Sequence, residues 1–332
     1  MKALVLTSVD GALEFREADD PVPAPGEALV RLRAAAANRR DFWITRGGYP
    51  NIKAPCVLGS DGAGILEKGG EGVDSSLMGK EVLINPSLHW GENQSVQGQD
   101  FRILGMPDNG TFADYITVPI SQIVEKPPHL SFHEAAALPL AALTAYRALF
   151  SRGQLHSNES ILITGIGGGV ATIALKMAHA VGARVFVSSS SEEKIAKAVT
   201  LGAVSGVNYT EQQWSDKFLS DYERVDMVLD GAAGESFGDL LPLVRPGGRV
   251  VSYGGTAGPS VAFPIRYHFW NQLQLIGSTM GSSSDFEKMI SFVTTHELKP
   301  VIHSICPLDE GASLISSMET SGQFGKLVME IS

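Results

Sequence analysis

The sequence contains few cysteines and histidines, 2 and 8 in 332 residues. Two cysteines can form neither a disulfide framework nor a cysteine-rich metal cluster. Basic residues are outnumbered, 26 against 36 acidic ones, and the net charge of −10 argues against binding to nucleic acid or to an anionic membrane surface. Long apolar runs are also missing, since residues 135–150 are interrupted by Pro139, Thr144 and Arg147 and cannot cross a bilayer.

The N-terminal apolar run is short and soon gives way to Ser8, Asp10 and Glu14, which predicts a first strand and not a signal peptide. We therefore expect a cytoplasmic protein. A chain of 332 residues with 44% hydrophobic side chains is long enough for two domains and a large core.

Two kinds of local pattern divide the chain. Strand-like runs between Pro- and Gly-rich turns (2–6, 27–36, 62–68, 81–85 and 112–118) predict a small, mostly antiparallel β barrel or sandwich. From about residue 131 to 280, strand and helix patterns alternate, which predicts a doubly wound parallel sheet. The last segment, with a helix at 285–298 and strands at 301–305 and 326–331, can return to the first domain. We expect domains at 1–122 and 123–280, with 281–332 as the returning segment.

The most informative stretch is 160–203. An apolar strand at 161–164 runs into the glycines at 165, 167, 168 and 169, and a helix and a second strand at 184–188 follow. Glycines at such a turn let a pyrophosphate approach the backbone, and the helix N-terminus offers it unpaired N–H groups. One helical face is apolar, formed by Val170, Ile173, Ala174, Met177 and Val181. This unit predicts dinucleotide binding and favours an oxidoreductase.

The end of the second strand indicates which dinucleotide binds. An NAD site usually has an Asp or Glu there, which accepts a hydrogen bond from the ribose 2′-OH. This chain has Ser188, Ser189, Ser190 and Ser191 instead, followed by Lys194. Hydroxyl groups and an ammonium can bind a 2′-phosphate, so the sequence favours NADP(H). Ser190 can also be the N-cap of the next helix with Glu193 completing a capping box, and both roles can hold together.

The glycine loop is accompanied, in order along the chain, by the segments AANRRD (36–41), LGSDGAG (58–64), GTFADY (110–115), AAALPLAALTAYRA (135–148) and GKLV (325–328). Over nearly its full length the chain resembles the medium-chain dehydrogenase/reductase superfamily, specifically its zinc-free, quinone-oxidoreductase-like members. The resemblance implies an α/β protein with a GroES-like catalytic domain (1–122), a Rossmann domain (123–280) and a C-terminal segment that rejoins the first domain. It also implies a homodimer, formed through the edge strand near 273–278.

Zinc-dependent members of this family bind the catalytic metal through Cys, a His-Glu pair and a later Cys or Asp. The corresponding positions here are Asn38, Ser60 with Asp61, and Leu140. Amide, hydroxyl and alkyl groups cannot replace those ligands. The lobe that holds a structural zinc in relatives corresponds to 86–108, which has no cysteine. We therefore expect no metal.

Without a metal, hydride transfer depends on positioning and on hydrogen-bond donors. This favours a quinone, an α,β-unsaturated carbonyl or a related aldehyde as substrate. We predict that Asn38 and Tyr49 are catalytic: Asn38 donates to the developing oxyanion, and Tyr49 or a water supplies the proton. The structural alternatives are an Asn in a turn and a Tyr packed on Pro50. Trp43 and Trp90 either line the substrate cleft or belong to the core.

The cofactor-binding residues expected from the glycine loop are Gly167, Gly168, Gly169 and Val170, and the serine run and Lys194 join them. The family resemblance adds nicotinamide-side contacts at Thr144, Gly254, Gly255 and Ser278, an adenosine-phosphate contact at Tyr209, and a distal phosphate or ribose contact at Lys326. Two other functions stay open. One is an alcohol or aldehyde carbonyl reductase, and the other is a non-catalytic NADPH-binding protein with an interaction or structural role.

Overall fold

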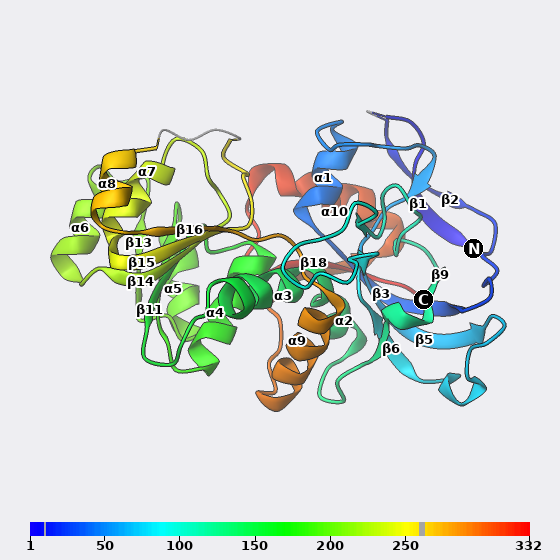
Figure 1. Cartoon of the computed structure of the whole chain (residues 1–332). Helices are drawn as coiled ribbons and strands as arrows, with labels where there is room; N and C mark the ends of the chain where they lie inside the picture. The colour runs from blue at the N-terminus through cyan, green and yellow to red at the C-terminus, as the bar shows by residue number, and fades with distance from the viewer. Residues whose placement is uncertain (10, 259–262) are drawn as a thin grey trace. The chain divides into compact units, whose positions relative to one another are not determined.

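The computed structural model describes residues 1–9, 11–258 and 263–332, and within it the chain divides into two compact units (Figure 1). Unit 1 comprises Met1–Leu143 and Gly281–Ser332, and unit 2 comprises Thr144–Met280. Residues 123–143, which we expected in the second domain, lie in unit 1. The reason is tertiary: β10 (Ile123–Glu125) pairs with β6 (Glu81–Ile84), and α2 (Phe132–Ala136) packs on β3 (Glu27–Ala37).

Unit 1 is a β-rich unit built on a seven-stranded sheet in the order β10-β6-β5-β3-β18-β17, in which β9 also pairs with β3. The other strands of this sheet are β5 (Asp61–Gly69), β9 (Tyr115–Pro119), β17 (Ile302–Pro307) and β18 (Lys326–Glu330). A second sheet has the order β2-β1-β4, with β1 (Lys2–Leu6), β2 (Leu13–Glu17) and β4 (Cys56–Val57), and a third pairs β7 (Ser87–Leu88) with β8 (Arg102–Ile103). The pairs are mostly antiparallel, and β18 brings the C-terminal segment back to β3, both as expected.

The core of unit 1 lies where alternate strand residues point inward. Along β3, buried and half-buried positions alternate over the first seven residues, the period of a pleated strand with one face on a core. Leu327 and Met329 of β18 belong to the same cluster as Leu32 and Phe112, so the returning segment completes this core. The helices of unit 1 are α1 (Arg39–Thr45), α2, α9 (Ser283–Thr295) and α10 (Gly311–Ser316).

Unit 2 has a six-stranded parallel sheet in the order β13-β12-β11-β14-β15-β16, and these strands lie side by side in Figure 1. They are β11 (Ser160–Ile163), β12 (Arg184–Ser189), β13 (Ser205–Asn208), β14 (Val225–Asp230), β15 (Val244–Ser252) and β16 (Gln274–Gly277). The chain builds outward from β11 to β13 and then returns to the other side of β11. This is the doubly wound topology that the strand–helix alternation predicts.

The helices of unit 2 are α4 (Gly169–Ala180), α5 (Glu192–Thr200), α6 (Trp214–Asp221), α7 (Phe237–Leu240) and α8 (Ile265–Trp270), while α3 (Pro139–Tyr146) crosses the unit boundary. Helices α4 to α7 bury apolar side chains, whereas none of the described residues of α8 is buried. On α4, Ile173, Ala174 and Met177 are buried as expected. Val170 and Val181 are only half-buried, because Val170 lies in the first turn and Val181 is already the C-cap. Among the described residues, no helix is long and apolar enough to cross a membrane.

Candidate functional site

The glycine turn of unit 2 leaves space where a side chain would otherwise lie. Gly165 and Gly167 have φ of +62° and +145°, a backbone region that disfavours other residues. Gly168 is the N-cap of α4, and a Cβ atom on Gly165 or Gly168 would have no neighbour within 4 Å. The first N–H groups of a helix have no partner within it. The turn therefore has both the room and the donors to hold a pyrophosphate.

The serine run of unit 2 lies at the end of β12, with the side chains of Ser188 and Ser189 buried and Ser190 exposed. The N-cap of α5 is Ser191 and not Ser190, because the strand runs one residue further than expected; the Ser191 Oγ accepts from the Lys194 N–H at 3.3 Å. Burial lowers the pKa of the Lys194 ammonium. Tyr209, 45% exposed, donates its N–H to the Ser189 carbonyl at 3.0 Å, so it lies next to the serine run.

Most of the predicted cofactor-binding residues lie at one edge of the parallel sheet, where strands end. The glycine turn follows β11, the serine run ends β12, Tyr209 follows β13, Gly254 and Gly255 follow β15, and Ser278 follows β16. Because parallel strands share a direction, these positions gather at the carboxyl edge of the sheet, where dinucleotides bind in this topology.

Two details of this edge suit a ligand. The Oγ of Ser278 is buried and has no partner among the described residues. A Cβ atom on Gly254 would lie 2.8 Å from the Gly231 carbonyl oxygen, so only glycine allows this close approach of two loops. Thr144 is buried, and its Oγ donates to the Met280 Sδ at 3.9 Å. Taken with the glycine turn, the residues present fit a dinucleotide.

A second polar group, here called the Asp61 cluster, lies in unit 1 and comprises Asn38, Asp61, Lys326 and the N–H of Leu140. The Asp61 Oδ2 accepts from the Asn38 Nδ2 and from the Lys326 Nζ, both at 2.9 Å, and its Oδ1 accepts from the Leu140 N–H at 2.7 Å. The Lys326 Nζ also donates to the Asn38 Oδ1 at 2.6 Å. All three side chains are buried.

Strand pairing explains why residues so distant in sequence meet. Ala36 of β3 is opposite Asp61 of β5, and Ala37 is opposite Leu327 of β18. Asn38 follows Ala37 and Lys326 precedes Leu327, so the ends of three adjacent strands bring the cluster together. Buried charges need such partners, because an unpaired one costs several kcal/mol.

The cluster uses much of the hydrogen-bonding capacity of two predicted site residues. The Asn38 Nδ2 donates to the Asp61 Oδ2 at 2.9 Å and to the Ala36 carbonyl oxygen at 3.5 Å. The Lys326 ammonium gives two of its three hydrogens to Asn38 and Asp61. The Lys326 ammonium thus retains one hydrogen for a substrate or cofactor, whereas both Asn38 Nδ2 hydrogens already have protein acceptors, the second at the long distance of 3.5 Å.

The residues at the family's zinc positions do not fit a zinc ion. Asp61 provides the carboxylate, but protein donors already occupy both of its oxygens. The Ser60 Oγ accepts from the Arg40 Nη1 at 2.7 Å and donates to the Leu104 carbonyl oxygen at 2.8 Å. Leu140 contributes only its backbone N–H. In the part of the chain that the structure describes, no group of three His, Cys, Asp or Glu side chains could hold a metal.

Tyr49 lies beside Arg40, an arginine to which we assigned no role from the sequence. The Arg40 guanidinium lies over the Tyr49 ring, 4.9 Å from its centroid, and the Arg40 Nε donates to the Tyr49 Oη at 3.4 Å. The neighbouring Asp41 is fully buried, and burial raises the pKa of its carboxyl to about 6 against the opposing charge of Arg40. The signal in the sequence was the charged run Arg39-Arg40-Asp41 directly after Asn38.

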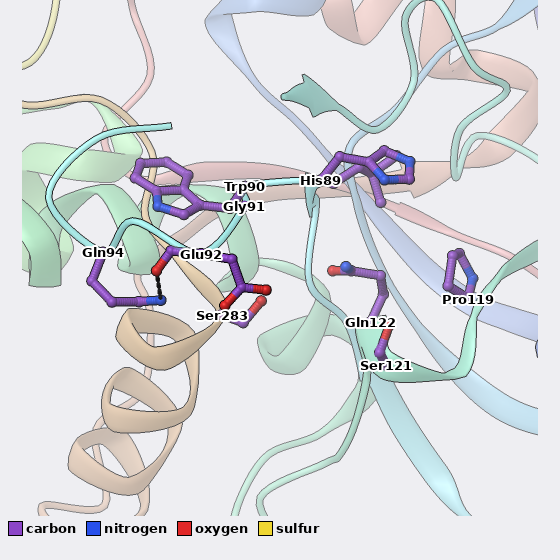
Figure 2. Close-up of a pocket in the computed structure, with 10 residues that line it drawn as sticks. His89, Trp90, Gly91, Glu92, Gln94, Pro119, Ser121, Gln122 and Ser283 are labelled. Carbon is purple, nitrogen blue, oxygen red and sulfur yellow. Dashed lines mark hydrogen bonds between the residues drawn. The ribbon is translucent and has the colours of Figure 1, made fainter. Parts of the chain in front are cut away.

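The two tryptophans have different surroundings. Trp43 is half-exposed and contacts Phe42 edge to face, whereas Trp90 is buried, contacts Phe101 in the same way and donates its Nε1–H to the Asn93 carbonyl oxygen. A cavity in unit 1 has a volume of about 340 Å³. Trp90 lines it together with His89, Glu92, Gln122 and Ser283, among other residues (Figure 2). None of the predicted catalytic or cofactor-binding residues lines it.

Comparisons with known proteins agree with this architecture. The family model described as the alcohol dehydrogenase GroES-like domain matches residues 24–128, and the one described as zinc-binding dehydrogenase matches 169–295. The zinc-type alcohol dehydrogenase-like protein YogA of Leptosphaeria maculans is 38% identical over 96% of this chain and 94% of its own length.

Acryloyl-coenzyme A reductase of Metallosphaera sedula is 28% identical over 99% of both chains. A crystal structure of an NAD-dependent alcohol dehydrogenase has a TM-score of 0.91 and 34% identity, covering 100% of both chains. The chain belongs to the medium-chain dehydrogenase/reductase superfamily, whose members are nicotinamide-dependent oxidoreductases with this pair of domains.

Proposed function

We propose that the protein is an NADPH-dependent reductase of quinones or α,β-unsaturated carbonyl compounds that works without zinc. The observation that carries the proposal is the Asp61 cluster, in which protein donors occupy the one carboxylate at the zinc positions. Without a Lewis acid, a carbonyl is reduced most easily when the arriving charge spreads by conjugation onto its oxygen, where hydrogen-bond donors can stabilise it. A full-length relative is named for the reduction of such a conjugated compound, acryloyl-coenzyme A.

The cofactor would be held by unit 2 and would supply the hydride. We assign the pyrophosphate to the first turn of α4, at Gly167, Gly168, Gly169 and Val170. The 2′-phosphate is assigned to Ser190 and Lys194 beside Tyr209, because residues 188–191 include no carboxylate to repel it. The nicotinamide side is assigned to Thr144, Gly254, Gly255 and Ser278. A solved relative of the same fold is NAD-dependent by name, so the preference for NADPH depends on the end of β12.

The substrate would be held by unit 1. Tyr49 is half-buried, so its hydroxyl can reach both protein and substrate, and we assign it the proton transfer to the substrate oxygen. Asn38 is assigned a second hydrogen bond to that oxygen. Lys326 holds Asn38 and Asp61 in place and keeps one hydrogen for a cofactor ribose or phosphate.

The test follows NADPH oxidation with 1,4-benzoquinone, an open-chain enone and benzaldehyde. Reduction of benzoquinone and the enone, with no reduction of benzaldehyde, supports the proposal. Only the first two compounds spread the incoming negative charge by conjugation onto their oxygen. Equal turnover of benzaldehyde would favour an alcohol or aldehyde carbonyl reductase. Tight NADPH binding with no reduction of any of the three would favour a non-catalytic binding protein.

We also propose that two copies of the chain associate through unit 2. β16 ends the sheet order, and an unpaired edge strand is a template for pairing with another strand. Leu275 of β16 is 41% exposed, and α8 exposes Ile265, Phe269 and Trp270 by 58% or more. An open edge strand and exposed apolar side chains in the same unit suit a symmetric contact between identical subunits. A cytoplasmic location stays a prediction from the sequence.

A further inference from the structure

We infer that Arg40 is a positioning residue for Tyr49: it fixes the phenol ring and stabilises the negative charge that develops on the Tyr49 oxygen during proton transfer. The inference rests on the proposed function, because it deepens the role assigned to Tyr49.

Hydrogen bonds to Ser60 and Leu104 hold one end of the Arg40 guanidinium, and its other end faces Tyr49. Arg40 lies in the first turn of α1 and is 8% exposed. Its Nη1 donates to the Ser60 Oγ at 2.7 Å and to the Leu104 carbonyl oxygen at 2.9 Å, which fixes the plane of the group. Its Nε then faces the Tyr49 Oη at 3.4 Å, with the ring centroid 4.9 Å from the guanidinium carbon.

The hydrogen bonds of Arg40 contribute little to the folded structure, and its charge offsets part of the cost of burying the Asp41 carboxyl. The Ser60 Oγ already donates to the Leu104 carbonyl oxygen at 2.8 Å, so neither atom would be left unpaired without Arg40. The Tyr49 side chain is half-buried, and water can solvate its hydroxyl. The Arg40 Nη2 is buried and has no partner among the described residues, which is a cost to stability.

Proton transfer from Tyr49 leaves a negative charge that the Arg40 guanidinium can stabilise. As the substrate carbon gains a hydride, the Tyr49 O–H bond breaks and its proton forms a new O–H bond on the substrate oxygen. The electron pair stays on the phenol oxygen, which faces the Arg40 Nε–H, and this charge-assisted hydrogen bond becomes stronger as the charge develops. Water returns a proton to Tyr49 after the step. Arg40 therefore acts through Tyr49 and touches neither substrate nor cofactor.

A double-mutant cycle tests the inference, using Arg40→Met, Tyr49→Phe and the double variant in the benzoquinone assay. We expect R40M to lower kcat roughly tenfold with KM and the NADPH Kd within about twofold of wild type. The double variant should match Y49F within about twofold, because residues that act as a unit are not additive. Arg40→Lys should recover part of the kcat that R40M loses, because lysine provides the positive charge but cannot stack its side chain on the Tyr49 ring as the planar guanidinium does.

Arg46→Met is the matched control. Arg46 directly follows the same helix, stacks on Phe42 and pairs with Glu319 at 2.9 Å, and no contact of it with Tyr49 is found in the described structure. It should keep wild-type turnover. Additive losses in the double variant, or normal turnover in R40M when Y49F is impaired, would overturn the inference. If R40M does not fold, the same cycle with R40K decides the question.

A measurement without turnover separates this inference from the proposed function. With ¹³C-labelled tyrosine, the Tyr49 ring signal is the one that disappears in the NMR spectrum of Y49F. We expect R40M to shift and broaden that signal and R46M to leave it unchanged. If no substrate is reduced, or if Y49F is fully active, the proposed function of Tyr49 fails, and an unchanged ring signal in R40M would show that the positioning fails too.

Discussion

Asn38 and Tyr49 differ in how much of their hydrogen-bonding capacity the fold already uses. Tyr49→Phe removes one hydroxyl at a half-buried position, and we expect kcat to fall about tenfold or more with little change in Tm. A lost donor at an enclosed oxyanion site costs about 2.7–4 kcal/mol, or roughly 10²–10³-fold, and water can replace part of it at this half-buried position. Tyr115→Phe, at another half-buried tyrosine, is the control.

Asn38→Ala should lower both kcat and Tm, because it also removes a hydrogen-bond partner from the Asp61 cluster. Steady-state kinetics measures kcat and thermal melts measure Tm, so the two variants can be distinguished. Turnover within about twofold of wild type in both variants would remove these residues from the mechanism.

The cofactor preference is a second question at the scale of single residues. We expect NADPH to bind at least about tenfold more tightly than NADH, a difference of only about 1.4 kcal/mol. Ser190→Asp should reverse the preference, because a carboxylate repels the 2′-phosphate and accepts from a free 2′-OH. Ser190 is the suitable position, since the Ser189 side chain is buried. Calorimetric titration measures both affinities, with the exposed Ser157→Asp as a charge control; equal affinities in the wild type would contradict the assignment.

Helix α1 carries a buried carboxyl whose ionisation opposes folding. Burial raises the pKa of Asp41 from 3.8 to about 6, so between these values the folded state holds a proton that the unfolded state has lost. The contribution of Asp41 to stability therefore falls as pH rises through this window and is constant above it. When the pH falls from 7.5 to 4.5, the free energy of unfolding of the wild type should rise by on the order of 2 kcal/mol more than that of Asp41→Asn. Urea unfolding of both proteins at the two pH values measures this difference. A constant difference would show that Asp41 ionises normally.

The edge strand β16 provides the second prediction at the scale of elements. A charged side chain on an edge strand blocks pairing with another strand. Sedimentation should therefore find the wild type as a dimer and Leu275→Lys as a monomer with an unchanged Tm. Val199→Lys, at a similarly exposed apolar position on α5, should stay dimeric. A monomeric wild type would refute the proposed contact.

For the whole molecule, the strongest prediction is that activity does not depend on metal. The purified protein should contain well under one equivalent of zinc and keep its turnover after EDTA treatment, because Lys326, Asn38 and the Leu140 N–H already occupy the Asp61 carboxylate. Elemental analysis and the quinone assay measure both quantities. Stoichiometric zinc that is lost together with activity would disprove it.

Local patterns in the sequence were sufficient for much of the fold. The run at 2–6 coincides with β1, and the glycine turn lies between a strand and a helix as expected. Such features depend on side-chain periodicity and on glycine's backbone freedom, and neighbouring residues alone set these. Element ends were less accurate, as the extension of β12 and the N-cap at Ser191 show.

The sequence by itself determined the kind of protein: a parallel-sheet unit with a dinucleotide turn, a β-rich unit, and no histidine or cysteine at the zinc positions. Only the tertiary structure decided that residues 123–143 join unit 1, that Lys326 and Asn38 share Asp61, and that Arg40 faces Tyr49. The physical reason is that strand pairing and packing bring these residues together. β10 pairs with β6, the ends of β18, β3 and β5 join Lys326, Asn38 and Asp61, and hydrogen bonds to Ser60 and Leu104 orient Arg40 toward Tyr49. Lys326 and Asn38 are 288 positions apart, a separation that no local pattern records.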